Sequence, residues 1–221
     1  ADERAVPFVA MDPGQTVHLF TGSKIGFPGP RVAFLYSEAE LAIADGRSAS
    51  ITELALTEAS ADTLFHNPAA LLGFEALLHD EAFAERPSLW PVAEGKLAVY
   101  RENRAIMLQG LAEHLAAYPE HFHWTEPQAG FFTVFTFLQG DVRTDEAFIS
   151  SLVADYGVVA IPMYEFYPDD AHRRNARAGY DQLRLSFCFN ESLGEQRRRD
   201  LREAVAAFCR AALAVSGLAA S

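Results

Sequence analysis

The chain has 221 residues, of which 50% are apolar and 22% are charged, and it carries a formal net charge of −12 at pH 7. This composition is typical of a globular protein with one large domain or two small ones. The acidic charge argues against a nucleic-acid partner, which needs clustered Lys and Arg. No apolar run approaches the roughly 20 residues that cross a bilayer, so no membrane partner is expected.

The cysteines and the N-terminal residues give an expectation for the cellular location of the protein. Cys188 and Cys209 form no Cys-x-x-Cys pair, so we expect no disulfide framework and a reducing, cytoplasmic location. The first residues, ADERAVPF, are acidic and lack the apolar stretch of a signal peptide. No initiator methionine precedes them, and we expect the chain to be part of a longer protein.

The first half of the chain predicts two short buried strands, followed by helices. A Gly/Pro-rich connection joins the two strands, and Asn67 with Pro68 supplies an N-cap and a first-turn proline for one of the helices. The predicted strands are residues 16–20 and 31–36, and the predicted helices are residues 38–45, 51–65, 67–79 and 92–118.

The second half predicts a mixture of strands and helices. Thr144 and Gly157 are placed to begin and end one helix, and Ser192 with Glu195 forms a capping box for the last helix. The apolar residues of that last helix recur at helical spacing and predict its core face. The predicted strands are residues 130–138, 158–161 and 182–187, and the predicted core face is Leu201, Val205, Phe208 and Ala212.

Lysine is rare in this chain. Among 18 basic residues only Lys24 and Lys96 are lysines. Arginine cannot replace lysine where a nucleophilic amine is needed, because the guanidinium stays protonated. Lys96 lies within a helical pattern and is interpreted as a surface residue. Lys24 is therefore the candidate nucleophile.

Lys24 lies in the segment TGSKIGFPGPR, residues 21–31, directly after a predicted strand. The hydroxyl of Thr21 and the guanidinium of Arg31 could hold a phosphate between them, since arginine matches phosphate oxygens with parallel hydrogen bonds. An amine beside a phosphate site is what pyridoxal phosphate requires. From spacing alone, a Gly/Pro turn with a surface lysine remains the alternative.

The same segment, extended to TGSKIGFPGPRVAF, resembles the lysine motif of fold-type I aminotransferases, in which Ser-x-Ser-Lys is followed by Pro-Gly-x-Arg. Further segments are similar to family motifs and follow in the expected order, so the resemblance covers nearly the whole chain. They are GFFTVFTF (130–137), GVVAIPMYEFYP (157–168) and YDQLRLSFCFNES (180–192).

The resemblance implies the C-terminal part of a class I/II enzyme of the aspartate aminotransferase superfamily, with an α/β fold. Residues 1–91 would be the C-terminal part of the cofactor-binding large domain. Residues 92–118 would form a long linking helix, and residues 119–221 would form the small C-terminal α/β domain.

The resemblance also implies roles for single residues. Lys24 would bind pyridoxal 5′-phosphate covalently as a Schiff base and then act as a general base. Thr21 and Arg31 would bind the cofactor phosphate, with Ser23 as a weaker candidate.

Two residues of the second half would bind the substrate. Arg184 would pair with the substrate carboxylate, and an exposed strand arginine is the alternative interpretation. Phe166 would line the substrate pocket, although it could equally be a core residue.

Departures from the family pattern predict that this chain alone is catalytically incomplete. The family also uses an Asp at the pyridinium nitrogen, a Tyr, an Asn and a stacked aromatic residue, and all of these precede the lysine. Asp2, the first aspartate of the chain, lies too close to Lys24 for that role. An N-terminal half of the same enzyme is therefore an expected partner.

The expected function is transfer of an amino group between an amino acid and a 2-oxo acid, by a homodimer. Residues 50–65, where dicarboxylate-specific relatives carry a second clamp, contain no arginine, so neutral, aromatic or basic substrates are expected. A pyridoxal-phosphate lyase, cyclase or amino-acid oxidase of specialised biosynthesis is one alternative. A non-catalytic fragment is another. We expect no metal, because His121 and His123 offer too few ligands.

Overall fold

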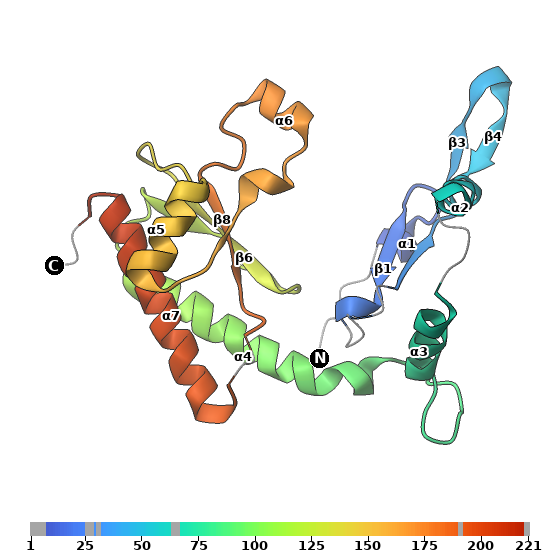
Figure 1. The fold of residues 1–221 in the computed structure, drawn as a ribbon, viewed down its shortest axis with the longest axis horizontal. Coiled ribbons are helices and arrows are strands. Elements are labelled where there is room, and N and C mark those ends of the chain that lie inside the picture. The colour runs from blue at the N-terminus through green and yellow to red at the C-terminus, as the bar shows by residue number, and fades with distance from the viewer. Residues whose placement is uncertain (1–7, 25–28, 30–31, 63–66, 190–191, 219–221) are drawn as a thin grey trace. The chain divides into compact units, whose positions relative to one another are not determined.

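The computed structural model describes residues 8–24, 29, 32–62, 67–189 and 192–218. It divides into two compact units, residues 1–95 and 96–221 (Figure 1). None of the helices in the described ranges is both long and apolar enough to cross a membrane.

The first unit begins with a short helix, α1 (Phe8–Met11), and an antiparallel hairpin of β1 (His18–Thr21) and β2 (Ala33–Tyr36). Both strands were predicted and are confirmed. A single 3-10 turn, η1 (Gly22–Lys24), directly follows β1. The hairpin therefore ends β1 at Thr21 and presents the turn that contains Lys24.

The helix predicted over residues 38–45 is wrong. The chain forms a second antiparallel hairpin there, with β3 (Glu40–Ala42) pairing with β4 (Ser48–Ser50). Asp45 adopts a left-handed backbone with φ of 66°, and Gly46 follows it at 71°. Asp-Gly is a strong signal for a tight hairpin turn, and this local preference overrides the helical composition before it.

Two helices complete the first unit, α2 (Ile51–Asp62) and α3 (Pro68–Leu78). The predicted N-cap is confirmed, because the Asn67 side chain accepts hydrogen bonds from the backbone N–H groups of the first turn of α3. The buried core of the described part of this unit is small and is made of Val32, Ala70 and Phe74, with Phe20 and Leu77 packed against it.

The second unit is built on a four-stranded antiparallel sheet with the strand order β5-β6-β8-β7. The strands are β5 (Phe122–Trp124), β6 (Phe132–Phe137), β7 (Ile161–Pro162) and β8 (Gln182–Ser186). The sequence did not predict β5, and it overestimated β7, of which only the last residues pair with β8.

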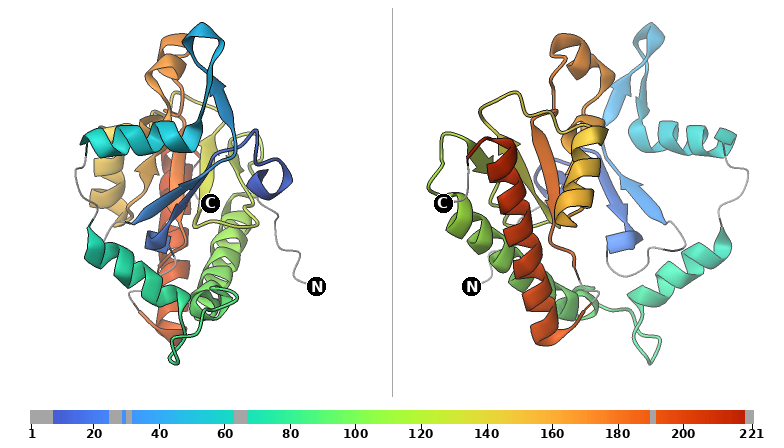
Figure 2. Two further views of the ribbon diagram at one scale, coloured as in Figure 1. Left: turned by 90° about the vertical axis from the view of Figure 1, so that its right-hand side faces the viewer. Right: turned by 60° about the vertical axis from the view of Figure 1, so that its left-hand side comes forward.

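Helices cover one face of this sheet, as the two views in Figure 2 show. They are α4 (Trp90–Leu115), α5 (Glu146–Tyr156) and α7 (Gly194–Val215). Alternate residues of β6 and β8 are buried, which is the pattern of a sheet with one covered and one open face. The other face carries the 3-10 turn η3 (Met163–Phe166). The short helix α6 (Asp169–Arg174) follows this turn in the chain.

The cap of α5 differs from the prediction at its start. Asp145, not Thr144, is the N-cap, and its carboxylate accepts a hydrogen bond from the Phe148 N–H at 3.1 Å. Thr144 is fully buried, and its hydroxyl lies 3.0 Å from the carbonyl oxygens of Tyr180 and Gln182. The end of the helix is as predicted, because Gly157 adopts the left-handed cap conformation with φ of 66°.

The capping box predicted for α7 is also wrong. The helix begins after Leu193, which makes no side-chain cap, and the Ser192 hydroxyl donates instead to Asp200 at 2.6 Å. Glu195 forms ion pairs with arginines of its own helix rather than reaching back to the cap. The predicted core face is confirmed, since Leu201, Val205, Phe208 and Ala212 are all buried.

Both cysteines are free thiols, as expected. Cys209 is 1% exposed in the core face of α7, and this burial raises the pKa of its thiol to about 12. Because the thiolate is the reactive form, Cys209 is a structural residue.

Gly110 allows α4 and α7 to approach closely. A Cβ atom at this position would lie 2.7 Å from Cγ1 of Val205. Gly110→Ala therefore forces the helices apart, and we expect the free energy of unfolding to fall by about 1–2 kcal/mol despite the better helix propensity of alanine.

Gly95→Ala, in the same helix, is the matched control. A Cβ atom at position 95 would have no neighbouring atom within 4 Å, so alanine should raise stability slightly. Chemical denaturation of both variants checks the prediction, and equal stability of the two would contradict it.

Candidate active site

The first group of predicted site residues lies at the end of β1. The Thr21 hydroxyl lies 3.1 Å from the Ser23 hydroxyl and 3.3 Å from the Val32 carbonyl oxygen, and it accepts a hydrogen bond from the Ser23 N–H at 3.2 Å. Gly22 donates its N–H to the same Val32 carbonyl at 3.0 Å. These bonds fix the turn that ends at Lys24 and bring Thr21 and Ser23 together.

This arrangement fits a phosphate ester. Thr21 is exposed and Ser23 is half-buried, so both hydroxyls lie beside the turn near the surface. Phosphate oxygens are held by such hydroxyls together with backbone N–H groups and a cation. The predicted cation, Arg31, lies outside the described residues, as does the side chain of Lys24.

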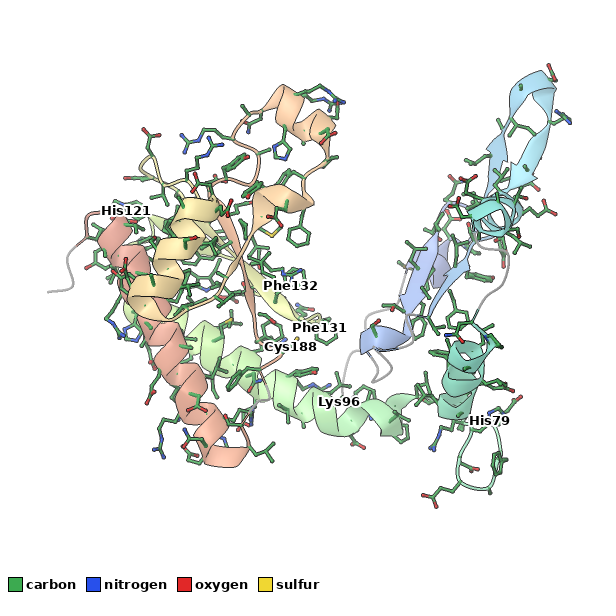
Figure 3. The ribbon with its side chains drawn as sticks, in the orientation of Figure 1. His79, Lys96, His121, Phe131, Phe132 and Cys188 are labelled. Atoms are coloured by element: carbon green, nitrogen blue, oxygen red, sulfur yellow. The ribbon has the colours of Figure 1, made fainter. Side chains whose placement is uncertain are left out.

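The second group lies on the open face of the sheet in the second unit. Arg184 is in β8 between the buried Leu183 and Leu185, so the alternation of the strand places its side chain opposite the core. Its guanidinium carbon lies 5.0 Å from the ring centre of Phe132 and 4.9 Å from that of Phe166. The structure thus places Arg184 beside Phe166. It also places Arg184 beside Phe132 of β6, which is labelled in Figure 3.

The charge of Arg184 is not compensated by any residue that the structure describes. Its Nε atom is buried without a hydrogen-bond partner, and it is not one of the arginines that form ion pairs. Burial of such a donor costs roughly 1–3 kcal/mol when it stays unpaired. Cation–π contacts return part of this energy. An arginine in this situation is suited to an anionic ligand.

Phe166 ends the turn η3, which a stack of aromatic side chains holds in place. The rings of Tyr164 and Tyr180 are parallel within 8° and their centres are 4.3 Å apart. Arg143 lies over the Tyr180 ring, with its guanidinium carbon 3.9 Å from the ring centre. Tyr167 donates its hydroxyl to the Gln182 side chain of β8 at 2.9 Å. These contacts tie the segment after β7 to β8.

Gly179 is required for this packing. Its φ is 74°, and a Cβ atom there would lie 2.7 Å from the Tyr164 nitrogen and from the Tyr167 ring. We expect Gly179→Ala to lower the free energy of unfolding by about 2–3 kcal/mol, since backbone strain and a steric clash add.

Gly140→Ala separates the two causes. Gly140 also has a positive φ, 83°, but the nearest neighbour of a Cβ atom at this position would lie 3.8 Å away. Thermal unfolding should show a smaller loss for this control, and an equal loss would mean that strain alone explains the effect.

A buried polar group that the sequence analysis missed holds the end of β8. Asn103 of α4 is fully buried and donates from its amide to the carbonyl oxygens of Phe187 at 3.0 Å and Phe189 at 2.7 Å. Arg197 of α7, 4% exposed, donates to the Asn103 side chain and to Glu102. The sequence did contain a signal for this burial, because Asn103 falls at the same helical spacing as the buried residues Met107 and Leu111 of α4.

The same group gives the stability of the protein a pH dependence. Hydrogen bonds from Arg198 and Arg197 hold the pKa of Glu102 below its usual value. Glu102 therefore contributes its full stabilising effect at pH values above the pKa that its carboxyl has in the unfolded chain. This stabilisation is lost as the pH falls through the lower pKa of the carboxyl in the folded chain. We expect the stability difference between the wild type and Glu102→Gln to shrink as the pH is lowered below about 4.5.

Urea denaturation at several pH values measures this difference. Glu94→Gln, at an exposed position of the same helix, is the control. Its difference in stability from the wild type should not shrink in this way as the pH is lowered. A constant difference for Glu102→Gln across the acid range would contradict the prediction.

Comparison with known proteins identifies the family. A model of the family described as aminotransferase class I and II matches residues 2–210. The (S)-3,5-dihydroxyphenylglycine transaminase of Amycolatopsis orientalis is 26% identical over 173 residues, which are 78% of this chain and 35% of that protein.

Solved structures show the same fold. The α-aminoadipate aminotransferase LysN of Thermus thermophilus, complexed with N-(5′-phosphopyridoxyl)-L-leucine, is 23% identical with a TM-score of 0.64, covering 98% of this chain and 48% of LysN. The kynurenine aminotransferase of Pyrococcus horikoshii is 21% identical with a TM-score of 0.66, covering 94% and 42%. The chain thus spans less than half the length of these relatives. Its fold is the fold-type I α/β fold predicted from the motifs, and the chain belongs to the aminotransferase class I and II family.

Proposed function

We propose that the protein is a pyridoxal-phosphate-dependent aminotransferase that moves an amino group between an amino acid and a 2-oxo acid. The observation that carries the proposal is Arg184, a partly buried cation whose Nε has no protein partner among the described residues and whose guanidinium is held between Phe132 and Phe166. Amino acids and 2-oxo acids share a carboxylate, which is the anion that a guanidinium binds with two parallel hydrogen bonds.

The turn after β1 provides the cofactor groups in this proposal. The hydroxyls of Thr21 and Ser23, with Arg31, bind the phosphate, and the amine of Lys24 binds the cofactor covalently. When bound, pyridoxal phosphate supplies an electron sink that stabilises negative charge at the substrate Cα.

The remaining roles belong to side chains of this chain. Arg184 binds the substrate carboxylate and fixes the orientation of the Cα–H bond. Lys24 Nζ, once the substrate amine has replaced it on the cofactor, would take the proton from the substrate Cα and release it again, which is general base and general acid catalysis by one group. Phe132 and Phe166, which are 40% and 52% exposed, are available to cover the bound carboxylate and exclude water.

The substrate side chain is proposed to be neutral or aromatic rather than dicarboxylic. Two phenyl rings beside Arg184 favour an apolar substituent next to the carboxylate. The names of two relatives, a dihydroxyphenylglycine transaminase and a kynurenine aminotransferase, support an aromatic substrate. LysN, named for α-aminoadipate, is the contrary example.

The active assembly is proposed to be a homodimer that also contains the N-terminal half of the enzyme. The resemblance to the family supports this, because the Asp, Tyr and Asn that it associates with the cofactor all precede the lysine. The two free thiols support a reducing, cytoplasmic location.

An absorption titration with pyridoxal phosphate tests the proposal. A visible band should form, disappear on addition of an aromatic amino acid and return on addition of a 2-oxo acid. A loss of the band that lasts until a 2-oxo acid is added separates transfer from the lyase and oxidase outcomes, which restore the starting form without a 2-oxo acid. A band that forms only with the N-terminal half present would still support the proposal, and no band under either condition would reject it.

A further inference from the structure

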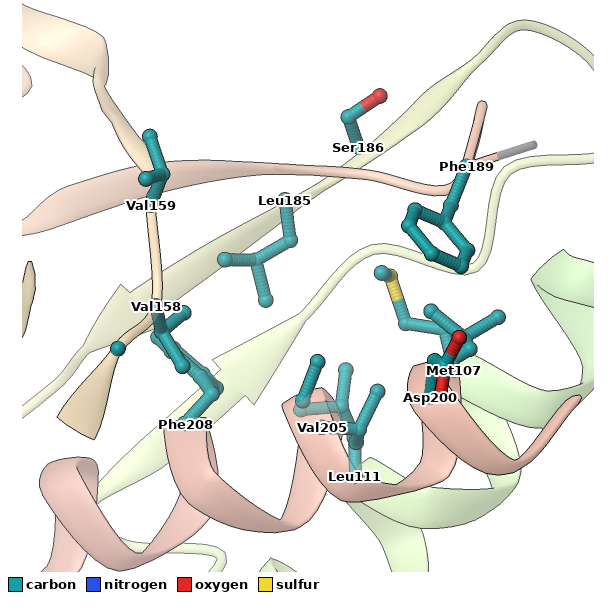
Figure 4. Close-up of a pocket in the computed structure, with 13 residues that line it drawn as sticks. Met107, Leu111, Val158, Val159, Leu185, Ser186, Phe189, Asp200, Val205 and Phe208 are labelled. Atoms are coloured by element: carbon teal, nitrogen blue, oxygen red, sulfur yellow. The ribbon is translucent and has the colours of Figure 1, made fainter. Parts of the chain in front are cut away.

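Strand β8 directs alternate side chains to opposite faces of the sheet. Leu185 points toward α7 and lines an apolar cavity of about 210 Å³ on the covered face, whereas the Ser186 side chain points away from α7 (Figure 4). By the same alternation, Gln182 and Arg184 lie on the open face. The arginine proposed to bind the substrate carboxylate therefore has Gln182 as its neighbour along the strand on that face.

The position of the Phe166 ring against Arg184 needs support from neighbouring residues. The ring is 52% exposed, so burial alone does not hold its centre 4.9 Å from the guanidinium carbon. Phe132, the other ring beside Arg184, belongs to a paired residue of β6, and the ladder with β8 fixes its backbone. Phe166 lies in the turn η3, outside the strands of the sheet. Its contact with Arg184 therefore depends on what attaches this turn to the sheet.

Tyr167 attaches the end of the turn to β8. Its hydroxyl donates to the side-chain oxygen of Gln182 at 2.9 Å, and the Gln182 amide donates in turn to the Thr136 hydroxyl at 3.4 Å. Thr136 is the partner of Gln182 in the register of β6 and β8, so the acceptor of the Tyr167 bond is itself held by the sheet. In the part of the chain that the structure describes, no other side-chain hydrogen bond joins residues 163–167 to β8.

We propose that the Tyr167 hydroxyl is a positioning group that keeps Phe166 against Arg184 and so orders the guanidinium for a carboxylate. This inference rests on the proposed binding of the substrate carboxylate by Arg184. The guanidinium forms no ion pair with a described residue, so the two rings are the contacts that restrict it. If the Phe166 ring moved away, the long arginine side chain would gain rotamers, and a carboxylate would have to order them again on binding.

Tyr167→Phe removes the hydroxyl and keeps the ring, so its effect on the holoenzyme isolates the hydrogen bond. KM for the amino acid should rise about fivefold, the equivalent of one neutral hydrogen bond. The turnover number kcat should change less than about twofold, because Arg184 holds the carboxylate equally before and during the reaction.

Arg184→Lys separates the two ways in which this expectation can fail. An unchanged KM in Tyr167→Phe, with KM raised in Arg184→Lys, would overturn the inference and leave the proposed function intact. An unchanged KM in both variants would reject Arg184 as the carboxylate site, and the inference would fall with it.

A second background shows whether the effect passes through Gln182. In a Gln182→Leu chain the Tyr167 hydroxyl has lost this acceptor, so Tyr167→Phe should leave KM unaltered there. A fivefold rise in both backgrounds would mean that the hydroxyl acts by another route, and it would overturn the inference.

A measurement on the whole chain without cofactor reports the contact directly. The Nε–H of Arg184 is buried, so its NMR signal should be protected from exchange and should show a nuclear Overhauser effect to the Phe166 ring. Tyr167→Phe should weaken this effect. Equal strength in the wild type and the variant would show that the hydroxyl does not hold the ring, whatever the enzyme catalyses.

Two further variants separate positioning from a general loss of stability. Val205→Ala, in α7 on the wall of the cavity beneath β8, should lower the thermal midpoint and leave KM unchanged. Tyr156→Phe also removes one hydroxyl, but Tyr156 packs against the core on α5, and KM should again stay unchanged. A rise of KM in Val205→Ala as large as that in Tyr167→Phe would show that KM follows stability, and it would overturn the inference.

Discussion

Lys24→Ala should abolish covalent attachment of pyridoxal phosphate, and Lys96→Ala should leave it unchanged. The two residues are the only lysines in the chain, so the comparison isolates one amine. Arginine cannot form the covalent bond, because its guanidinium stays protonated. Borohydride reduction of the protein with cofactor, followed by peptide mass mapping, should place the label on the segment that contains Lys24.

The catalytic effect of the same change should be large. Loss of the group that moves the Cα proton should lower kcat by about 10²–10⁴-fold in the assembled enzyme. An exposed lysine such as Lys96 has no such role, so its alanine variant should keep full activity. Label on Lys96 together with full activity of Lys24→Ala would refute the assignment.

Arg184→Lys should raise KM for the amino acid by roughly two orders of magnitude while the thermal midpoint changes little. Lysine keeps the charge but cannot form two parallel hydrogen bonds with a carboxylate, and it loses the planar stacking against Phe132 and Phe166. Because Arg184 has no ion pair with any described residue, its replacement breaks no salt bridge in the described structure.

Arg177→Gln is the control for Arg184. Arg177 is an exposed arginine paired with Asp141 at 2.9 Å, and its loss should change neither KM nor kcat. Competitive inhibition by benzoate reports the carboxylate site directly. Unchanged inhibition in Arg184→Lys would place the carboxylate elsewhere.

The sequence predicted local structure well where a residue acts through its neighbours in the chain. Asn67 caps α3, Gly157 ends α5, and the apolar spacing of α7 identifies its buried face. Each of these signals depends on backbone groups or side chains within a few residues, so no tertiary information is required.

The predicted helix caps were wrong where groups farther along the chain form hydrogen bonds with the capping side chain instead. Thr144 and Ser192 have the chemistry of helix caps, but Thr144 bonds to carbonyls near β8 and Ser192 bonds to Asp200 within α7. The hairpin of β3 and β4 replaced a predicted helix because a left-handed Asp45-Gly46 turn allows pairing that composition alone does not show.

The sequence by itself determined the family, the order of the elements and the chemical candidates, because motifs and residue types are local properties. Lys24, Thr21 and Ser23 were found from one segment, and Arg184 from one strand. Only the tertiary structure decided that Phe132 joins Phe166 around Arg184, and that Asn103 and Arg197 hold the end of β8. Those contacts join residues far apart in the chain, and strand register and helix packing, rather than local preference, bring them together.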